Sequence, residues 1–242
     1  IYKFKRIDKS CFAGSYYAEN FYERQNDMNQ LLKAAQNFGL VIYDRNYGRG
    51  LKQYSFPNQF SENILGKLNA DEIDVAYKGY KVSLNVNSVV NSETMCSRRV
   101  FECLASYTPV VSTYSRAIEN LLPNLVQMGK NEVEYNKVLS DLFENEDFYN
   151  RIAHLGYRYV MENHTFGQRL EYILEKVNVN IEAESSKVTI WSLIKDINEC
   201  EIILANYKKQ KYQYKELLLI CENKDCYTSI SNLNSNQIKV IA

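Results

Sequence analysis

The chain lacks a net charge of either sign. Its 242 residues hold 29 lysines and arginines against 29 aspartates and glutamates. Proteins that bind nucleic acid through their overall field carry an excess of basic residues, so this balance argues against a nucleic-acid partner. The composition, 45% hydrophobic and 24% charged, is that of a globular protein with enough length for one large domain or two unequal ones.

Long hydrophobic runs are also missing. No window reaches the roughly 20 apolar residues of a membrane-spanning helix, and the opening IYKFKRIDKS lacks the apolar core of a signal peptide. We therefore expect a cytoplasmic protein without a transmembrane segment. Because the chain begins without methionine, we also expect a fragment of a longer protein.

Metal-ligand and phosphate-binding motifs are absent as well. The six cysteines form no C-x-x-C pair, and only two histidines could join them, so we expect buried reduced thiols and no metal site. The sequence has no G-x-G-x-x-G and no G-K-[ST], which excludes the usual dinucleotide fingerprint and the P-loop.

What the chain does have is an alternation of short apolar runs with helical patterns, which predicts an α/β fold with a parallel sheet flanked by helices. Asn69 and Asp71 are candidate caps for short helical pieces, and Thr165 with Gln168 fits a capping box. In the first part we expect strands at 10–14, 40–44, 81–88 and 108–113, helices at 21–39 and 96–106, short helical pieces over 62–80, and helices over most of 131–177.

The pattern stops and restarts near residue 180. Residues 178–187 are polar and aperiodic, as in a linker. We therefore predict a first domain at 1–177 and a small, truncated β-α-β unit at 188–242, too short to be a complete enzyme. Within that unit we expect strands at 188–194, 215–222 and 238–242 and a helix at 198–210.

Ligands of an open parallel sheet bind beyond the carboxyl ends of the strands, so the residues after each expected strand are the first candidates for a site. The pair Gly14 and Ser15 follows the first strand, where backbone N–H groups could face a phosphate, although a plain tight turn explains the same pair. Asp44 and Arg45 follow the second strand and are also ordinary turn residues.

Residues 85–99 place many polar side chains where a strand leads into a helix. Asn85 and Asn87 end the strand, and Glu93 lies in the loop. Arg98 and Arg99 open the helix, where the positive end of the helix dipole disfavours cations unless an anion lies above them. An anion-binding site is therefore one interpretation of these arginines.

The other interpretation is structural. Arg98 and Glu102 are spaced to form an ion pair on the surface of an amphipathic helix, worth only about 0.2–0.5 kcal/mol. Because Glu102 lies between Phe101 and Cys103, its carboxylate needs donors, which could be an arginine, a backbone N–H or the hydroxyls of a ribose. The residues alone leave both interpretations open.

Two further features define no site by themselves. Arg24 lies on the expected first helix, where we expect it to be solvated. The twenty tyrosines suit stacking on carbohydrate, but they are spread along the whole chain.

Four stretches, in order, resemble the C-terminal domain of group-one glycosyltransferases, and in particular the spore maturation protein CgeB-like branch. The resemblance covers about residues 8–177 and implies the nucleotide-sugar-binding half of a GT-B fold, with a Rossmann-like parallel sheet flanked by helices. The N-terminal half would be located elsewhere in the parent protein. The stretches are CFAGSYYAENFYERQNDM, LVIYDRNYG, YKVSLNVNSVVNSETMCSRRVFECLASYTPVVSTYS and RYVMENHTFGQRLEYIL.

The resemblance implies a hexosyltransferase-like enzyme that uses a nucleotide-sugar donor, a UDP-sugar, without a metal or other cofactor. Its acceptor would be a cell-surface or spore-coat glycan. In the family, the glutamate of an R-x-x-E-x-x-A helix bonds the donor ribose, which here is Glu102, with Arg99 three residues before it. The loop that holds Gly14 and Ser15 corresponds to the one that approaches the diphosphate.

The sequence departs from the family at two places. Many relatives have two glutamates with seven residues between them, whereas Glu93 and Glu102 have eight, and Tyr107 stands where a helix-ending glycine is usual. The stretch KVTIWSLIKDINECEIILANYKKQKYQYKELLLICEN resembles the opening of a family-two, GT-A glycosyltransferase, which implies a fusion of two transferases. The alternative function is a non-catalytic, degenerate transferase module that binds protein or glycan.

Overall fold

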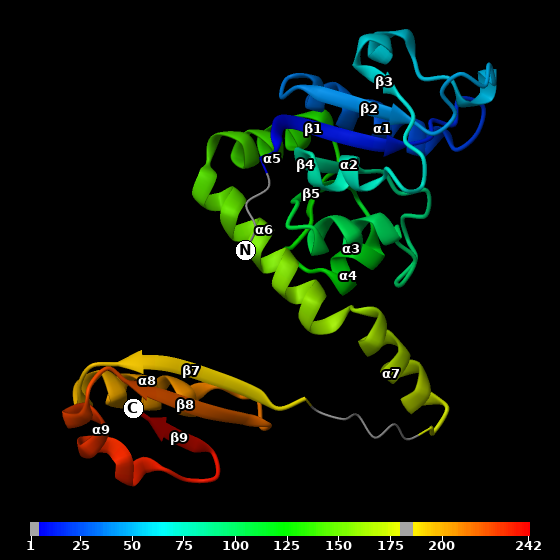
Figure 1. Ribbon diagram of the computed structural model, residues 1–242. Coiled ribbons are helices and arrows are strands. Elements are labelled where there is room, and N and C mark those ends of the chain that lie inside the picture. Colours follow the sequence, from blue (N-terminus) through cyan, green and yellow to red (C-terminus); the bar gives the residue numbers. More distant parts are fainter. Residues whose placement is uncertain (1–4, 180–185) are drawn as a thin grey trace. The chain divides into compact units, whose positions relative to one another are not determined.

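The computed structural model describes residues 5–179 and 186–242 (Figure 1). It divides into two compact units, Ile1–Ile173 and Leu174–Ala242. The expected linker at 178–187 falls mostly on residues 180–185, which lie outside the described residues. Within the described parts of the chain, no helix is both long and apolar enough to cross a membrane.

The first unit is built on a six-stranded parallel sheet with the order β3-β2-β1-β4-β5-β6. This order is that of a doubly wound sheet, whose winding direction reverses between β1 and β4. The predicted α/β, Rossmann-like class is confirmed. The strands are β1 (Ile7–Gly14), β2 (Leu40–Asp44), β3 (Ile64–Gly66), β4 (Tyr80–Asn85), β5 (Val110–Thr113) and β6 (Gln127–Gly129).

Helices cover both faces of this sheet, as buried parallel strands require. On one face α1 and α5 pack over Phe12, Ile42 and Leu84, and on the other α2, α3 and α6 cover residues that include Cys11 and Val110. The helices are α1 (Tyr22–Gln36), α2 (Asp74–Lys78), α3 (Arg98–Ala105), α4 (Arg116–Leu121), α5 (Glu132–Glu144), α6 (Glu146–Asn163) and α7 (Phe166–Lys176).

The segment 62–80 differs from the sequence expectation. Instead of helical pieces alone, Ile64–Gly66 forms the edge strand β3, because its backbone pairs in parallel with β2 and satisfies that strand's outer N–H and C=O groups. Helix α2 begins only at Asp74, after Ile73, and no side chain caps it. The expected caps Asn69 and Asp71 are therefore wrong.

The capping box of α7 is confirmed. The Thr165 backbone N–H donates to Gln168 Oε1 at 2.8 Å, and the Gln168 N–H donates to Thr165 Oγ1 at 3.4 Å. Two free N–H groups at the start of a helix are thereby satisfied. The helical stretch predicted for 131–177 is present as α5, α6 and α7.

The second unit is a three-stranded parallel sheet with the order β7-β8-β9. The buried face of the sheet packs against α8 and α9 through a core that includes Ile194, Leu217 and Leu219. Its elements follow the predicted pattern closely and are β7 (Val188–Ile194), α8 (Ile197–Lys209), β8 (Lys215–Cys221), α9 (Lys224–Ile230) and β9 (Ile238–Ile241).

All six cysteines are free thiols, as predicted. Five are buried and Cys96 is half-buried. Burial raises the pKa of the Cys103 thiol to about 12, which keeps it protonated at neutral pH. These thiols act as small apolar side chains of the core.

Candidate functional site

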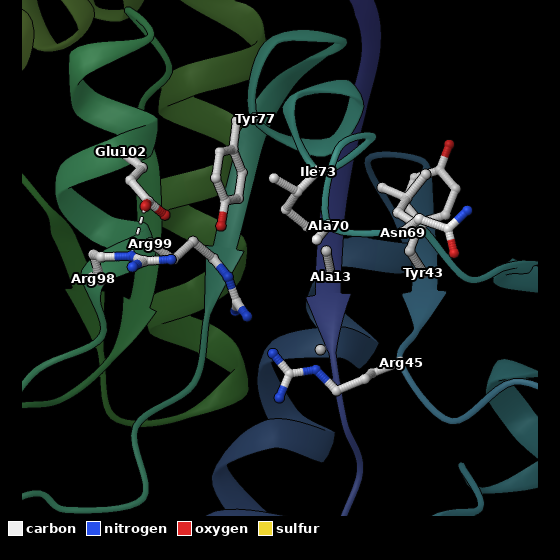
Figure 2. A pocket seen from close by; sticks show the side chains of 12 residues that line it. Ala13, Tyr43, Arg45, Asn69, Ala70, Ile73, Tyr77, Arg98, Arg99 and Glu102 are labelled. Atoms are coloured by element: carbon white, nitrogen blue, oxygen red, sulfur yellow. Dashed lines mark ion pairs between the residues drawn. The ribbon is translucent and has the colours of Figure 1, made fainter.

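A pocket of about 300 Å³ lies where the winding of the large sheet reverses. Its walls come from the carboxyl ends of β1 and β2, the segment 68–77 that leads into α2, and the first turns of α3 (Figure 2). Ligands of doubly wound sheets bind at this position, because the loops that follow neighbouring strands diverge there and leave a crevice.

Five of the ten candidate residues from the sequence line this pocket: Gly14, Arg45, Arg98, Arg99 and Glu102. They come from three separate elements. The chain thus brings together residues that are up to 88 positions apart, the separation between Gly14 and Glu102.

Gly14 and Arg99 are in close contact within the pocket. A Cβ atom added to Gly14 would lie 2.8 Å from Cζ of Phe12 and 3.4 Å from Nη2 of Arg99. The Arg99 guanidinium also lies over the Phe12 ring, 5.6 Å from its centroid. Among the described residues no carboxylate pairs with Arg99, and its buried Nε has no hydrogen-bond partner. The main chain of Gly14 and the guanidinium of Arg99, which no carboxylate neutralises, therefore line the same part of the pocket.

Arg98 and Glu102 form the ion pair that the sequence left as an alternative, with Arg98 Nε 2.7 Å from Glu102 Oε1. Exposed pairs of this kind contribute about 0–1 kcal/mol to stability, and the Arg98 side chain is 80% exposed. Glu102 is less exposed, at 34%, and its carboxylate stays on the pocket wall.

Tyr77 shares that wall, and Figure 2 shows its hydroxyl directed toward Glu102 and Arg99. Burial, followed by the negative charge of Glu102, raises the pKa of Tyr77 to about 12. The phenol therefore stays protonated at neutral pH and can donate to the carboxylate.

Asn85 and Asn87 lie outside the pocket lining and have a structural role. Asn85 Nδ2 donates to Ser112 Oγ at 2.9 Å, and Asn87 Nδ2 donates to the Thr113 carbonyl at 2.8 Å. Both asparagines are buried. They tie the ends of β4 and β5 together, since buried polar groups need partners.

Three other candidates also lie outside the lining. Asp44 Oδ1 accepts the Asn46 N–H at 2.9 Å, as in an ordinary Asx turn, and burial raises the pKa of Asp44. Ser15 Oγ accepts from Asn46 Nδ2 at 3.2 Å, and Glu93 Oε1 lies 2.6 Å from Arg116 Nη2.

Arg24 was missed by the sequence interpretation. It is only 8% exposed, so the expectation of a solvated side chain is wrong. Its Nη2 donates to the Ser15 carbonyl at 3.2 Å. Its pKa is lowered mainly by burial, with a further contribution from the nearby Arg99. The periodicity of α1 carried this signal, because Arg24 is one turn before the buried Met28 and on the same face.

The pocket is cationic where the Arg45 and Arg99 side chains line it, with Arg99 beside Gly14, and apolar where Ile73 and neighbouring residues line it. Glu102 adds a hydrogen-bond acceptor on the α3 wall. Such a site suits an anionic ligand that also has hydroxyl groups and a flat apolar part.

The fold has relatives among solved structures, although no curated protein matches the chain significantly. A mutant of S. aureus TarM, crystallised in complex with Fondaparinux, alpha-GlcNAc-glycerol and UDP, is similar in fold, with a TM-score of 0.51 and 13% identity. The match covers 73% of this chain but only 36% of TarM, so the chain spans about a third of that protein.

A second solved structure is the C-terminal domain of a group 1 family glycosyl transferase (LpcC) from Francisella tularensis, with a TM-score of 0.45, 13% identity, and coverage of 66% of this chain and 88% of that one. The profile of the family described as "Glycosyl transferase-like" matches residues 24–175, which is more than half of the chain and includes the α3 side of the pocket. The chain therefore belongs to the glycosyl transferase-like family.

Proposed function

We propose that residues 1–177 are the donor-binding domain of a nucleotide-sugar-dependent glycosyltransferase, with a UDP-sugar as the donor. The observation that carries the proposal is the convergence of Gly14, Arg99 and Glu102 in one pocket at the reversal point of the sheet. A bound UDP in the TarM structure, which has the same fold, is consistent with this donor.

Each charge of the pocket has its own role in this proposal. The Gly14 backbone and Arg99, with Arg45 nearby, hold the diphosphate, and Glu102 accepts hydrogen bonds from the ribose hydroxyls. Arg98 is paired with Glu102 and keeps that carboxylate in place. Donors that stabilise the departing nucleoside diphosphate lower the barrier to sugar transfer without a metal ion.

We also propose that the enzyme belongs to the CgeB-like branch, transfers a hexose, and acts on a cell-surface or spore-coat glycan. A second, N-terminal domain of the parent protein completes the GT-B cleft. Residues 188–242, whose elements alternate as β-α-β-α-β, are the opening of a GT-A-like unit.

Calorimetric titration of UDP tests the proposal. Glu102→Ala weakens UDP binding about 10- to 150-fold, because hydrogen bonds to a charged group are worth about 1.5–3 kcal/mol. The matched control is Glu162→Ala, which also removes an exposed i,i+4 ion pair to an arginine, Arg158, but at a residue outside the pocket lining. Equal affinities of the wild type and Glu102→Ala would refute the assignment of Glu102.

A further inference from the structure

Two loops leave the sheet edge that carries the pocket, residues 15–21 after β1 and residues 45–57 after β2 (Figure 1). They are joined by hydrogen bonds, since the Ala18 N–H donates to the Gln53 carbonyl at 2.7 Å and Asn46 Nδ2 donates to Ser15 Oγ at 3.2 Å. Because the first loop begins directly after Gly14, the joined loops form a surface that adjoins the pocket.

Three aromatic rings gather on this surface, and we name them the aromatic platform: Tyr17, Phe21 and Tyr54. The Tyr17 ring makes edge contacts with both others, at 5.7 Å to Phe21 and 5.6 Å to Tyr54. The Arg24 guanidinium lies 4.8 Å from the Tyr17 centroid and occupies one face of that ring. The rings are therefore held in place before any ligand arrives.

Phe21 has a strained backbone conformation and an exposed apolar side chain, and both are unfavourable for folding stability. It adopts the left-handed conformation, with φ 62° and ψ 55°, which costs a non-glycine residue on the order of 1–3 kcal/mol. Its ring is 56% exposed, so burial does not compensate that cost. It also provides no side-chain cap to α1. The Phe21 ring makes the edge contact with Tyr17 but is otherwise largely open to solvent, so this strained position is a candidate for ligand contact.

The residues around Phe21 indicate the class of ligand. Glu19, Asn20 and Glu23 flank it and are exposed. Their oxygens can accept hydrogen bonds from hydroxyl groups, and the two carboxylates next to Phe21 disfavour an anionic group at that ring. A flat aromatic face next to such acceptors matches a pyranose, which has an apolar C–H face and a rim of hydroxyls.

We propose that the aromatic platform binds a sugar unit of a neutral glycan, with Phe21 stacked on the pyranose ring. Sugar stacking at this surface needs only the rings and their neighbours, so sugar binding at the platform does not depend on nucleotide binding in the pocket. Because the platform adjoins the Gly14 end of the pocket, a glycan bound there is placed to accept the transferred sugar. This acceptor role rests on the proposed function.

Titration of the full chain with neutral tetrasaccharides of glucose and N-acetylglucosamine, followed by saturation-transfer NMR, tests the platform. Phe21→Asn removes the ring but accepts the left-handed backbone. We expect it to lower glycan affinity at least ten-fold while the unfolding temperature stays the same or rises. Phe166→Ala, which removes a phenylalanine that is 87% exposed on α7, is the matched control and leaves glycan binding unchanged.

Three results overturn the proposal: no tetrasaccharide binds the wild type, Phe21→Asn binds as tightly as the wild type, or a sulfated tetrasaccharide binds as tightly as the neutral ones. UDP affinity is measured on the same samples. If Phe21→Asn loses glycan binding but still binds UDP, the lost affinity is assigned to the aromatic platform. If the wild type binds glycan but not UDP, the result counts against the donor site and not against the platform.

Discussion

Gly14 is the residue at which one added methyl group should change the pocket most. Its φ lies outside the left-handed region, so alanine is acceptable to the backbone, but the new Cβ would lie 2.8 Å from the Phe12 ring. We expect Gly14→Ala to lower the free energy of unfolding by about 1–3 kcal/mol through overpacking. Displacement of Arg99 should weaken UDP binding about ten-fold, equivalent to ~1.4 kcal/mol.

Chemical denaturation and UDP titration of Gly14→Ala measure both effects. Gly167→Ala is the matched control, since its nearest atom would be Thr165 Oγ1 at 4.0 Å and alanine favours the helix by about 0.5–1 kcal/mol. UDP affinity of Gly14→Ala equal to that of the wild type would show that the Gly14 loop lies away from the ligand.

At this scale the sequence predicted the polar residues that follow strands, because strand ends are local features. Burial of Arg24 was missed, because the helical period that puts it on the buried face with Met28 does not show the acceptor of its guanidinium, the Ser15 carbonyl. Tyr107, by contrast, is a departure from the family pattern that the sequence already showed. It occupies the usual glycine position with φ 62°, and its ring contacts His154 and Tyr157 there.

At the scale of elements, the C-terminal end of α3 depends on Arg6. The helix ends with the Thr108 N–H bonded to the Cys103 carbonyl and the Tyr107 N–H bonded to the Leu104 carbonyl. The Arg6 guanidinium then donates to the Ser106 and Tyr107 carbonyls, at 2.8 and 3.2 Å. It joins α3 to the end of α2 by a third bond, to the Lys78 carbonyl at 3.0 Å.

We expect Arg6→Ala to lower the free energy of unfolding by about 2–3 kcal/mol, since it removes several part-buried hydrogen bonds to carbonyls and each bond to a charged group contributes about 1.5–3 kcal/mol at most. Urea denaturation measures the change. Arg151→Ala, on the exposed side of α6, provides the control and changes stability by less than about 0.5 kcal/mol. A loss for Arg6→Ala as small as that of the control would contradict its role as a link between helices.

Helices and strands with a clear period were predicted well, because their signal lies within one segment. The three-residue strand β3 was not predicted, since it exists only through its pairing with β2. The elements α4 and β6 fall at 114–130, where the sequence pattern predicted neither a helix nor a strand. Short elements owe their structure to distant partners, which local patterns do not reveal.

At the scale of the whole molecule, the order of the strands could not be predicted from the sequence, because pairing in a parallel sheet joins distant segments. The pocket depends on that order, since the reversal between β1 and β4 opens the crevice. The cores of the two units are separate clusters, and the core of the second unit is drawn only from residues 190–240.

We therefore expect two unfolding transitions. The single tryptophan, Trp191, lies in β7 and reports the second unit by fluorescence, whereas circular dichroism reports both. UDP at 100 times its Kd should stabilise the first unit by about 2.7 kcal/mol and leave the tryptophan transition in place. Leu219→Ala, in the second core, should shift only the tryptophan transition, by about 2–5 kcal/mol. A common shift of both transitions with UDP would show that the units unfold together.

The central claim is that Glu102 holds the ribose of a nucleotide donor. Its most direct test compares the Kd of UDP with that of 2′,3′-dideoxy-UDP for the wild type and for Glu102→Ala. The wild type should lose about ten-fold or more in affinity when the two hydroxyls are removed, because hydrogen bonds to a charged group are worth about 1.5–3 kcal/mol. Glu102→Ala should bind both nucleotides equally. The same ratio of affinities in the wild type and the variant would contradict the account.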